Sequence, residues 1–522
     1  MIDLNGAASG INFATSFTED SAPVAIVSST LTLTDIDNPT VFSATVRITN
    51  LQDSEAESLS IPSTFSYMAA TYSTSTGTLM LIGEATLAQY EQVLRTVTYR
   101  NTPQNPGFGD RTITFTVNDG ATDSAVATST VTVFPTNDAP LLDLNGAAPG
   151  TNFTTTFTED GGAVAIVSSS LSLIDLDSPT VNGASVRITN LQNIGAEILT
   201  ADATGTNIEL TYDANAGVLG LRNFDTVANY EKVLRSIQYS NTSQNPTFGD
   251  RTIQFNVNDS MANSNQAFAT VTVIPINDAP VIDLNGNDTG TGFSTSFTEN
   301  GGAVAIVSPT LNLTDVDSPS VNIATVRIMN LSDASAEFLA ANTAGTNITA
   351  TYYGDPFGIL ELRGWDSVAN YQQVLRSVTY NNTSANPTGG DRSIQFSVND
   401  SMANSNQGFA TVSVIAVNSA PTLTGTPAAL TNGTEDTTYT IATTDLLAGF
   451  TDIEGNTITI ANLTATNGAI VNNGDGNYTF TPAANFNGTV NLSYSVSDGN
   501  GGVTSATQSF SLKRVFEKSV GS

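Results

Sequence analysis

The strongest constraint on the fold is an internal repeat. The block Asp3-Leu4-Asn5-Gly6 returns at Asp143 and again at Asp283, a step of 140 residues each time. Because 522 residues exceed the usual span of one hydrophobic core, we predict several tandem domains. They are repeat 1 (residues 1–140), repeat 2 (141–280), repeat 3 (281–421), a shorter and divergent fourth domain (422–513), and a tail (514–522).

Each unit carries a strong strand pattern. Ile253, Phe255 and Val257 alternate with polar residues, and the same alternation occurs at matching places in the other repeats. Such a period of two places one face of a strand in a core and the other in water. Val131-Thr132-Val133 is expected to form the last strand of repeat 1.

One segment breaks this period and predicts a short helix. Val227, Tyr230 and Val233 lie at helical spacing behind a possible Thr226 cap, and the segment recurs near Leu87 and Val368. We find no regular helices between strands that would make parallel crossovers. The repeats are therefore expected to be all-β, with antiparallel sheets and an Ig-like sandwich architecture.

The charge balance restricts the possible partners. The chain has 48 Asp and Glu against 16 Lys and Arg, a formal net charge of -32. Nucleic acid and anionic membrane surfaces are excluded as partners because both require basic patches. A carboxylate excess of this size requires high ionic strength or bound cations, and calcium suits oxygen ligands.

The chain contains no Cys and no His. Thiol nucleophiles, disulfides, histidine-assisted serine catalysis and the usual zinc ligands are thereby excluded. Acidic pairs repeated in polar turns also differ from a glycosidase site, which needs two acids flanking a cleft. We therefore expect no enzymatic activity.

Acidic residues recur at strand ends in every repeat. In repeat 1 they are Glu19 near the start, Asp35-Ile36-Asp37 after an early strand, Asp119 after a late strand, and Asn137-Asp138 in the linker. Loops at the base of one domain and at the top of the next can converge on one point. A hard cation that takes six to eight oxygen ligands suits such a cluster.

With these motifs the chain resembles the cadherin superfamily, and more closely the cadherin-like repeats of large bacterial surface and secreted adhesins. The resemblance rests on Thr18-Glu19, Asp35-Ile36-Asp37, Val117-Asn118-Asp119 and the Asn137-Asp138-Ala139-Pro140 linker. It implies tandem cadherin-like antiparallel β-sandwich domains in a linear array. It also implies Ca²⁺ between consecutive domains, held by an upper-domain Glu, by linker residues, and by the lower domain's Asp-x-Asp and late-loop Asp.

Carried over by position, the resemblance gives three sets of metal ligands. The first junction would use Glu19, Asn137, Asp138, Asp175, Asp177 and Asp259. The second would use Glu159, Asn277, Asp278, Asp315, Asp317 and Asp400. At the third, Ser419 replaces the linker Asp, so we expect a weaker or empty site with Glu299, Asp452, Glu454 and Asp498. The linkers also lack the family's leading Asp, which favours one or two ions per junction.

The remaining recurrent residues are interpreted as framework. Six arginines are expected to make internal salt bridges or to cover apolar surface rather than to bind ligands: Arg95, Arg235, Arg376, Arg111, Arg251 and Arg392. Tyr90, Tyr230 and Tyr371 are expected in the core. Trp365, at the place that Phe224 holds in repeat 2, is also expected to be a packing residue.

Together these features predict an extracellular or bacterial cell-surface segment, structural or adhesive and stiffened by calcium. Alternative functions are carbohydrate-binding modules of a secreted protein or a subunit of a self-assembling surface filament. The expected partners are calcium and a cell-surface protein, a glycan or copies of the chain itself. No membrane-spanning segment is predicted. Met1 to Gly6 do not form a signal peptide, so either the chain is a fragment or export uses another route.

Overall fold

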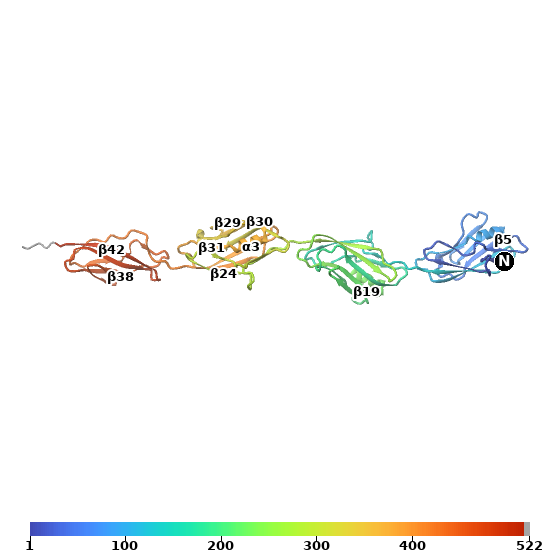
Figure 1. The fold of residues 1–522 in the computed structure, drawn as a ribbon, viewed down its shortest axis with the longest axis horizontal. Coiled ribbons are helices and arrows are strands. Elements are labelled where there is room, and N and C mark those ends of the chain that lie inside the picture. The colour runs from blue at the N-terminus through green and yellow to red at the C-terminus, as the bar shows by residue number, and fades with distance from the viewer. Residues whose placement is uncertain (516–522) are drawn as a thin grey trace, which may run out of the picture. The chain divides into compact units, whose positions relative to one another are not determined.

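The computed structural model describes residues 1–515, and of the predicted tail, residues 516–522 lie outside this part. Contacts divide the chain into two compact units, Met1–Ile276 and Asn277–Ser522. Each unit contains two bodies built of strands (Figure 1), and each body has a hydrophobic cluster of its own. The described residues form mainly strands, as the all-β prediction has it, arranged as tandem β-sandwiches.

Repeat 1 is a sandwich of a larger and a smaller sheet. The larger has the order β2-β11-β10-β5-β8-β7, the smaller has the order β3-β9-β6, and β1 pairs with β4. The elements are β1 (Ile2–Asp3), β2 (Phe13–Thr18), β3 (Val24–Ala25), β4 (Thr32–Leu33), β5 (Thr40–Ile48), η1 (Ser54–Ala56), β6 (Glu57–Ser60), β7 (Ala69–Ser73), β8 (Thr78–Thr86), α1 (Leu87–Leu94), β9 (Thr98–Asn101), β10 (Gly109–Asn118) and β11 (Ala127–Phe134).

The two sheets share one core because apolar residues alternate along their strands. In β10, Ile113 and Phe115 are buried, as the sequence pattern predicts. Phe17 from the larger sheet meets Tyr99 from the smaller sheet edge to face, with ring centroids 5.5 Å apart. The same ring pair recurs in the next two repeats.

Repeats 2 and 3 repeat this plan with the same strand orders. Repeat 2 contains β12 (Leu141–Asp143), β13 (Phe153–Thr158), β14 (Val164–Ala165), β15 (Ser172–Ile174), β16 (Thr180–Ile188), β17 (Glu197–Thr200), β18 (Glu209–Asp213), β19 (Val218–Thr226), α2 (Val227–Arg235), β20 (Gln238–Asn241), β21 (Gly249–Asn258) and β22 (Ala267–Ile274). Repeat 3 contains β23 (Val281–Asp283), β24 (Phe293–Thr298), β25 (Val304–Ala305), β26 (Asn312–Thr314), β27 (Ser320–Ile328), η2 (Ala334–Ala336), β28 (Glu337–Ala340), β29 (Thr349–Tyr353), β30 (Ile359–Ser367), α3 (Val368–Arg376), β31 (Thr379–Asn382), β32 (Gly390–Asn399) and β33 (Gly408–Ile415).

One strand pair in each repeat departs from the antiparallel prediction. β2 pairs with β11 in parallel, from Phe13 opposite Ser129 to Thr18 opposite Phe134, and β13 with β22 and β24 with β33 do the same. In each repeat, the first long strand and the last strand run from the entry end to the exit end. Two neighbouring strands with the same direction can only pair in parallel.

The predicted helices are present at the expected places as α1, α2 and α3. Thr226 caps α2, because its side chain accepts a hydrogen bond from the Asn229 backbone N–H. Tyr230 on this helix is fully buried and donates to the Asn223 carbonyl at 2.6 Å. Among the helices of residues 1–515, none is long and apolar enough to cross a membrane.

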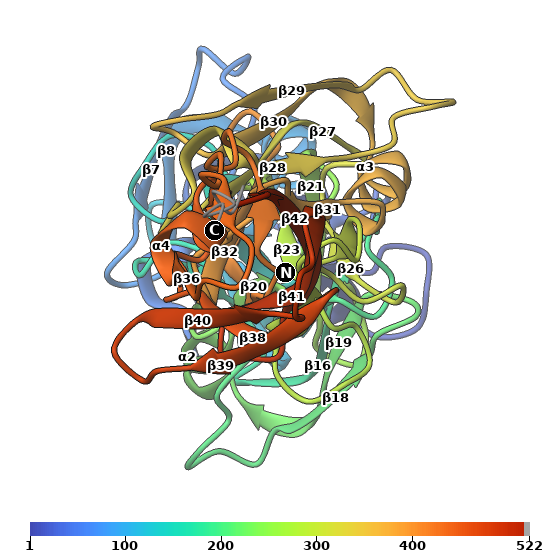
Figure 2. The ribbon, with the colours of Figure 1, turned by 90° about the vertical axis from the view of Figure 1, so that its left-hand side faces the viewer.

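The fourth domain is a smaller version of the same plan, with sheets ordered β35-β42-β41-β38 and β36-β40-β39. Its larger sheet ends at β38, and β39 lies beside that strand (Figure 2). The elements are β34 (Thr422–Leu423), β35 (Gly433–Thr434), β36 (Tyr439–Ala442), α4 (Thr443–Leu447), β37 (Phe450–Thr451), β38 (Thr459–Ala465), β39 (Gly468–Asn472), β40 (Asn477–Pro482), β41 (Gly488–Ser497) and β42 (Val503–Lys513).

The recurrent arginines are framework residues, as predicted. Arg251 of β21 is buried and bonds to the carboxylate of Glu197 on β17, in the opposite sheet. The Tyr239 hydroxyl donates to the same carboxylate at 2.9 Å. Arg111 and Arg392 occupy matching buried places with Glu57 and Glu337. Arg95, Arg235 and Arg376 each donate to a backbone carbonyl in the loop before an early strand.

The prediction that Trp365 is a packing residue is wrong. Its side chain is 58% exposed, and Phe224 at the matching place is 57% exposed. Leu360 and Leu362 on β30 are buried, but the pairing of β30 with β27 shifts register between Arg363 and Asp366, and Trp365 lies in this irregular stretch with its side chain in solvent.

Candidate metal centres at the ends of the repeats

The predicted ligands lie where strands end, as the sequence indicates. Glu19 directly follows β2, Asp175 and Asp177 follow β15, and Asp259 follows β21. Loops at strand ends often carry binding residues, because the rigid sheets position them.

Glu19 is held against the linker that leaves repeat 1. The Thr136 backbone N–H donates to Glu19 Oε2 at 2.8 Å. Glu19 Oε1 is buried and has no hydrogen-bond partner. Burial, with the charges of Asp138 and Asp20, raises the pKa of Glu19.

Asp138 in the linker faces the carboxylates of repeat 2. Burial, followed by the charge of Asp177, raises the pKa of Asp138, and burial raises the pKa of Asp175, with repulsion from Asp177 and Asp259 adding to it. The Ser178 backbone N–H donates to Asp175 Oδ1 at 2.8 Å. The remaining oxygens Asp138 Oδ2, Asp175 Oδ2 and Asp177 Oδ1 are buried without a partner.

Asn137 completes this group. Its Nδ2 donates to Asp259 Oδ2 at 2.8 Å, and Asp259 Oδ1 accepts the backbone N–H groups of Met261 and Ala262. Burial opposes ionisation of Asp259, but these hydrogen bonds lower its pKa. All six residues predicted for the first junction are therefore linked by hydrogen bonds or by mutual charge.

The donor set fits a hard cation. Folded proteins leave few buried polar atoms without a partner, and here four such carboxylate oxygens belong to predicted ligands, namely Glu19, Asp138, Asp175 and Asp177. Carboxylate and amide oxygens are the ligands that calcium prefers. In residues 1–515, no group of three or more acidic side chains is already arranged to hold a metal ion.

Repeat 3 carries a matching group within its own unit. Asn277 Nδ2 donates to Asp400 Oδ2 at 2.7 Å, and the Asp278 backbone N–H donates to Asp317 Oδ2 at 3.2 Å. Asp315 Oδ2 and Asp317 Oδ1 are buried without a partner. Glu159, predicted for the same junction, belongs to the other unit, where its Oε2 accepts the Ile276 backbone N–H at 2.8 Å.

In calcium-free buffer, the free energy of unfolding of repeat 3 is expected to fall as the pH rises from about 4 to above 6. Burial, with repulsion from Asp317 and Asp400, raises the pKa of Asp315 from 3.8 to about 6. Between these values the folded state binds a proton that the unfolded state has lost, so each increase in pH costs stability.

The single Trp of the chain, Trp365, lies in repeat 3 and reports its unfolding by fluorescence in urea. Asp315→Asn is the control, because the amide does not titrate. A wild-type slope between pH 4 and 7 that Asp315→Asn leaves unchanged would contradict the assignment to Asp315.

The group before the fourth domain is less complete. The Val417 backbone N–H donates to Glu299 Oε2 at 2.9 Å, and Asn418 Nδ2 donates to Asp498 Oδ2 at 2.6 Å. Ser419 takes part through its backbone: its N–H donates to Glu454 Oε1 at 3.2 Å, and its carbonyl accepts from Asn418 Nδ2 at 3.4 Å. Glu299 Oε1, Asp452 Oδ2 and Glu454 Oε2 are buried without a partner.

Sequence reasoning missed two acidic residues of this architecture. Asp20 adds its charge to both Glu19 and Asp138. Glu435 of the fourth domain accepts the Val515 backbone N–H at 2.6 Å, as Glu19 accepts that of Thr136, but its second oxygen accepts Asn487 Nδ2 at 3.1 Å. The signal was available, because Thr434-Glu435-Asp436 repeats Thr18-Glu19-Asp20.

Comparison with known families confirms the resemblance for one span. Residues 417–513 match the model of the cadherin-like domain family. Halomucin of Haloquadratum walsbyi is 38% identical over 114 residues, which cover 20% of this chain and 1% of halomucin. The chain thus matches only a small fraction of the length of that relative.

Three solved structures show weak likeness to the chain. Extracellular cadherin domains 1–5 of protocadherin gamma B2 cover 98% of this chain and 81% of their own, with TM-score 0.36 and 11% identity. Domains EC22–24 of mouse cadherin-23 cover 79% and 98%, with TM-score 0.27 and 12% identity. An endo-fucoidan hydrolase of glycoside hydrolase family 107 covers 61% and 39%, with TM-score 0.15 and 16% identity. None of these likenesses bears on the chemistry of the carboxylates.

Proposed function

We propose, from the premise that residues 417–513 are a cadherin-like domain, that this chain is a non-enzymatic extracellular segment with a structural or adhesive role, stiffened by calcium at the ends of its repeats. The observation that carries the proposal is the set of buried carboxylate oxygens without a donor at Glu19, Asp138, Asp175 and Asp177. Leaving such groups unpaired costs folding free energy, and a bound cation would remove that cost.

The residues of repeats 1 and 2 would divide the task. Glu19 and Asp138 would hold the ion from the side of repeat 1 and its linker, and Asp175, Asp177 and Asp259 from the side of repeat 2. When bound, calcium supplies the positive charge that lets neighbouring carboxylates stay ionised. Without it, repulsion among these groups favours a looser joint between the two repeats.

An extracellular setting is supported by the cadherin-like family and by the partial match to halomucin. The net charge of -32 supports the same setting, because such a chain needs cations in its surroundings. The partner would be a cell-surface protein, a glycan or a copy of the chain.

Calcium titration by calorimetry, together with small-angle scattering in calcium and in chelator, tests the proposal. We expect calcium to bind and to increase the maximum dimension of the particle, because linked repeats lose bending freedom. Magnesium at the same concentration is the control, since it requires a stricter octahedral geometry. If calcium neither binds nor changes the scattering, the acidic motifs serve only as turns and the proposal fails.

A second candidate function, carbohydrate recognition, is favoured by one observation. Phe224 and Trp365 occupy matching places in two repeats and are more than half exposed, as sugar-stacking residues are. Binding of a glycan that quenches Trp365 fluorescence and survives chelation would support this function. A glycan array without calcium-independent binding would exclude it.

Ser419→Asp is expected to tighten calcium binding at the group before the fourth domain at least tenfold. The linkers of the other repeats carry Asp138 and Asp278 at this place, so the substitution supplies the missing carboxylate. A further charged ligand typically increases the affinity of an oxygen site. Calorimetry of this variant against Ser419→Asn, which adds an amide but no charge, separates charge from size, and equal affinity in the two variants would contradict this role for Ser419.

A further inference from the structure

Repeats 1 to 3 extend their larger sheet beyond the four strands found in the fourth domain. In repeat 1 the extension is the hairpin of β7 and β8, and β7 is the last strand of the sheet. Ala69 lies opposite Ile82, and Thr71 lies opposite Met80. Directly opposed residues share a face, so these four side chains form one outward patch.

The outward patch of repeat 1 is apolar, whereas its counterparts are charged. In repeat 2 the matching places pair Glu209 with Arg222. In repeat 3, Glu361 forms an ion pair with Arg363 at 2.9 Å. Ile82 takes the place of Arg222 and Arg363 and is 47% exposed. Met80 takes the place of Gly220 and Glu361 and is 40% exposed.

The free edge of β7 also lacks the usual protection. An edge strand presents unpaired backbone N–H and C=O groups, and proteins normally block it with charge or proline. β18 in repeat 2 has Glu209 and Asp213 at its ends, but β7 reads Ala69-Ala70-Thr71-Tyr72-Ser73. The edge strand of repeat 3, β29, is also uncharged, but the Glu361–Arg363 ion pair lies on the strand beside it, β30. Another extended strand can replace water at such an edge and hydrogen-bond to it along its length.

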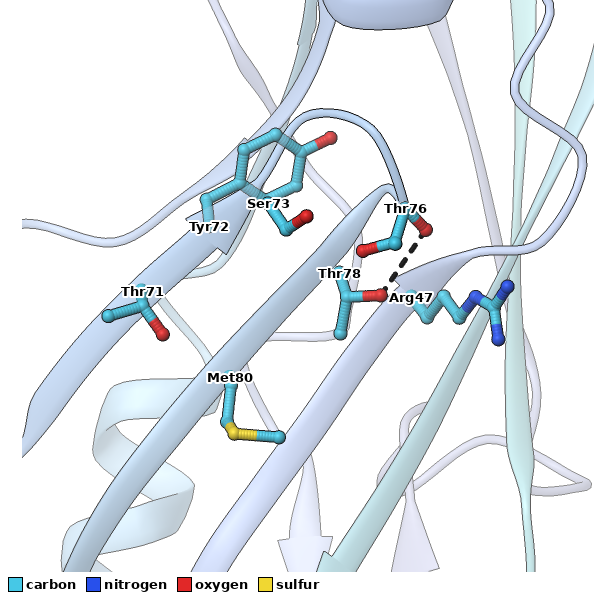
Figure 3. Close-up of a pocket in the computed structure, with 7 residues that line it drawn as sticks. All are labelled: Arg47, Thr71, Tyr72, Ser73, Thr76, Thr78 and Met80. Atoms are coloured by element: carbon cyan, nitrogen blue, oxygen red, sulfur yellow. Dashed lines mark hydrogen bonds between the residues drawn. The ribbon is translucent and has the colours of Figure 1, made fainter.

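A hollow of about 390 Å³ lies on this face, beside the edge strand. Figure 3 shows Thr71, Thr78, Met80 and Arg47 around it, and the Thr78 hydroxyl donates to the Thr76 carbonyl. None of the residues that line it is acidic, and Arg47 is the one charged residue among them. A partner that carries many carboxylates therefore meets no like charge here.

We propose that repeat 1 pairs with repeat 1 of a second copy of this chain, β7 against β7 and antiparallel. Two chains of net charge -32 repel each other, so contact between them is least opposed on a face without carboxylates. Antiparallel pairing centred on Thr71 places Thr71 opposite Thr71 and Ala69 opposite Ser73. The pairing is isologous, so it closes as a dimer.

Pairing of two copies through β7 does not require calcium or the proposed calcium sites. The patch lies on strands and contains none of the predicted metal ligands. Dimerisation is therefore tested in chelator, where loss of the calcium function has no effect on the result.

Sedimentation equilibrium of the whole chain in chelator and about 1 M NaCl, where charges are screened beyond about 3 Å, measures the association. We expect the wild type to reach twice the monomer mass and Thr71→Lys to remain monomeric. Thr211→Lys, at the matching exposed place in repeat 2, is expected to dimerise like the wild type. A wild type that remains monomeric at every concentration, or a Thr211→Lys variant equally impaired, would overturn the proposal.

A single cysteine tests the register, because the chain contains none. Thr71→Cys places two thiols opposite each other across the pair, so mild oxidation by copper phenanthroline is expected to join two chains by one disulfide. Thr211→Cys is the control and is expected to stay largely monomeric. Equal cross-linking of both variants would show that the thiols meet by random collision and would overturn the register.

Discussion

Arg251→Leu is expected to lower the free energy of unfolding of repeat 2 by about 3–5 kcal/mol. Arg251 and Glu197 are both almost fully buried, and the guanidinium also donates to the Thr247 carbonyl at 2.8 Å. Without the arginine, the Glu197 carboxylate keeps only the Tyr239 hydroxyl and the backbone N–H groups at its other oxygen. An unpaired charge in a low-dielectric interior accounts for the size of the loss.

A fluorescent reporter in repeat 2 allows this loss to be measured. Trp365→Phe and Phe224→Trp together move the single Trp into repeat 2, at a matching exposed place. Arg222→Leu is the matched control, because Arg222 is exposed in the same repeat and its loss is expected to change stability by less than about 0.5 kcal/mol.

The double variant Glu197→Leu/Arg251→Leu separates two explanations. If the cost comes from the stranded carboxylate, removing both charges recovers most of it. If the double variant is as unstable as Arg251→Leu alone, then the lost packing of the arginine stem accounts for the effect, and the ionic explanation is wrong.

Asp175→Asn/Asp177→Asn is expected to reverse the effect of calcium on repeat 2. Calcium at a hundredfold excess over the dissociation constant should stabilise the wild type by about 2.7 kcal/mol relative to chelator, which is enough to make it more stable than the variant. In chelator the variant should be the more stable, because it lacks two buried carboxylates that repel each other. Asparagine keeps the acceptor for the Ser178 N–H, so the loop itself is preserved.

Urea unfolding with the same Phe224→Trp reporter, in calcium and in chelator, measures both halves of this prediction. Glu209→Gln/Asp213→Asn is the control, because it removes two exposed negative charges from repeat 2 away from the predicted ligands. A variant that responds to calcium as the wild type does would show that Asp175 and Asp177 hold no ion.

Much of the fold follows from the sequence alone. The step of 140 residues predicts the repeats, the alternation at Ile253, Phe255 and Val257 predicts strands, and the helical spacing behind Thr226 predicts α2. The strand and helix patterns are local, since each depends only on neighbours within a few residues, and the repeat can be read by comparing the sequence with itself. The acidic residues at strand ends could be placed for the same reason, because turns interrupt the strands.

Only the tertiary structure decided which distant groups meet. The sequence singles out Arg251 as a framework residue but not its partner Glu197, which lies 54 residues away in the opposite sheet. The parallel pairing of β2 with β11 joins the two ends of repeat 1 and leaves no local trace. The outward position of Trp365 was missed because recurrence at a framework position does not reveal which face of β30 a residue occupies.

The candidate metal centres show the same division. The sequence alone places Glu19, Asp138 and Asp175 at strand ends or in a linker, and the resemblance to cadherin repeats grouped them into one predicted site. Whether an oxygen is buried without a donor depends on backbone and side chains from segments more than a hundred residues apart, such as Thr136 beside Glu19. Desolvation is a property of the assembled fold, so only the folded chain shows which carboxylates are ready for a cation.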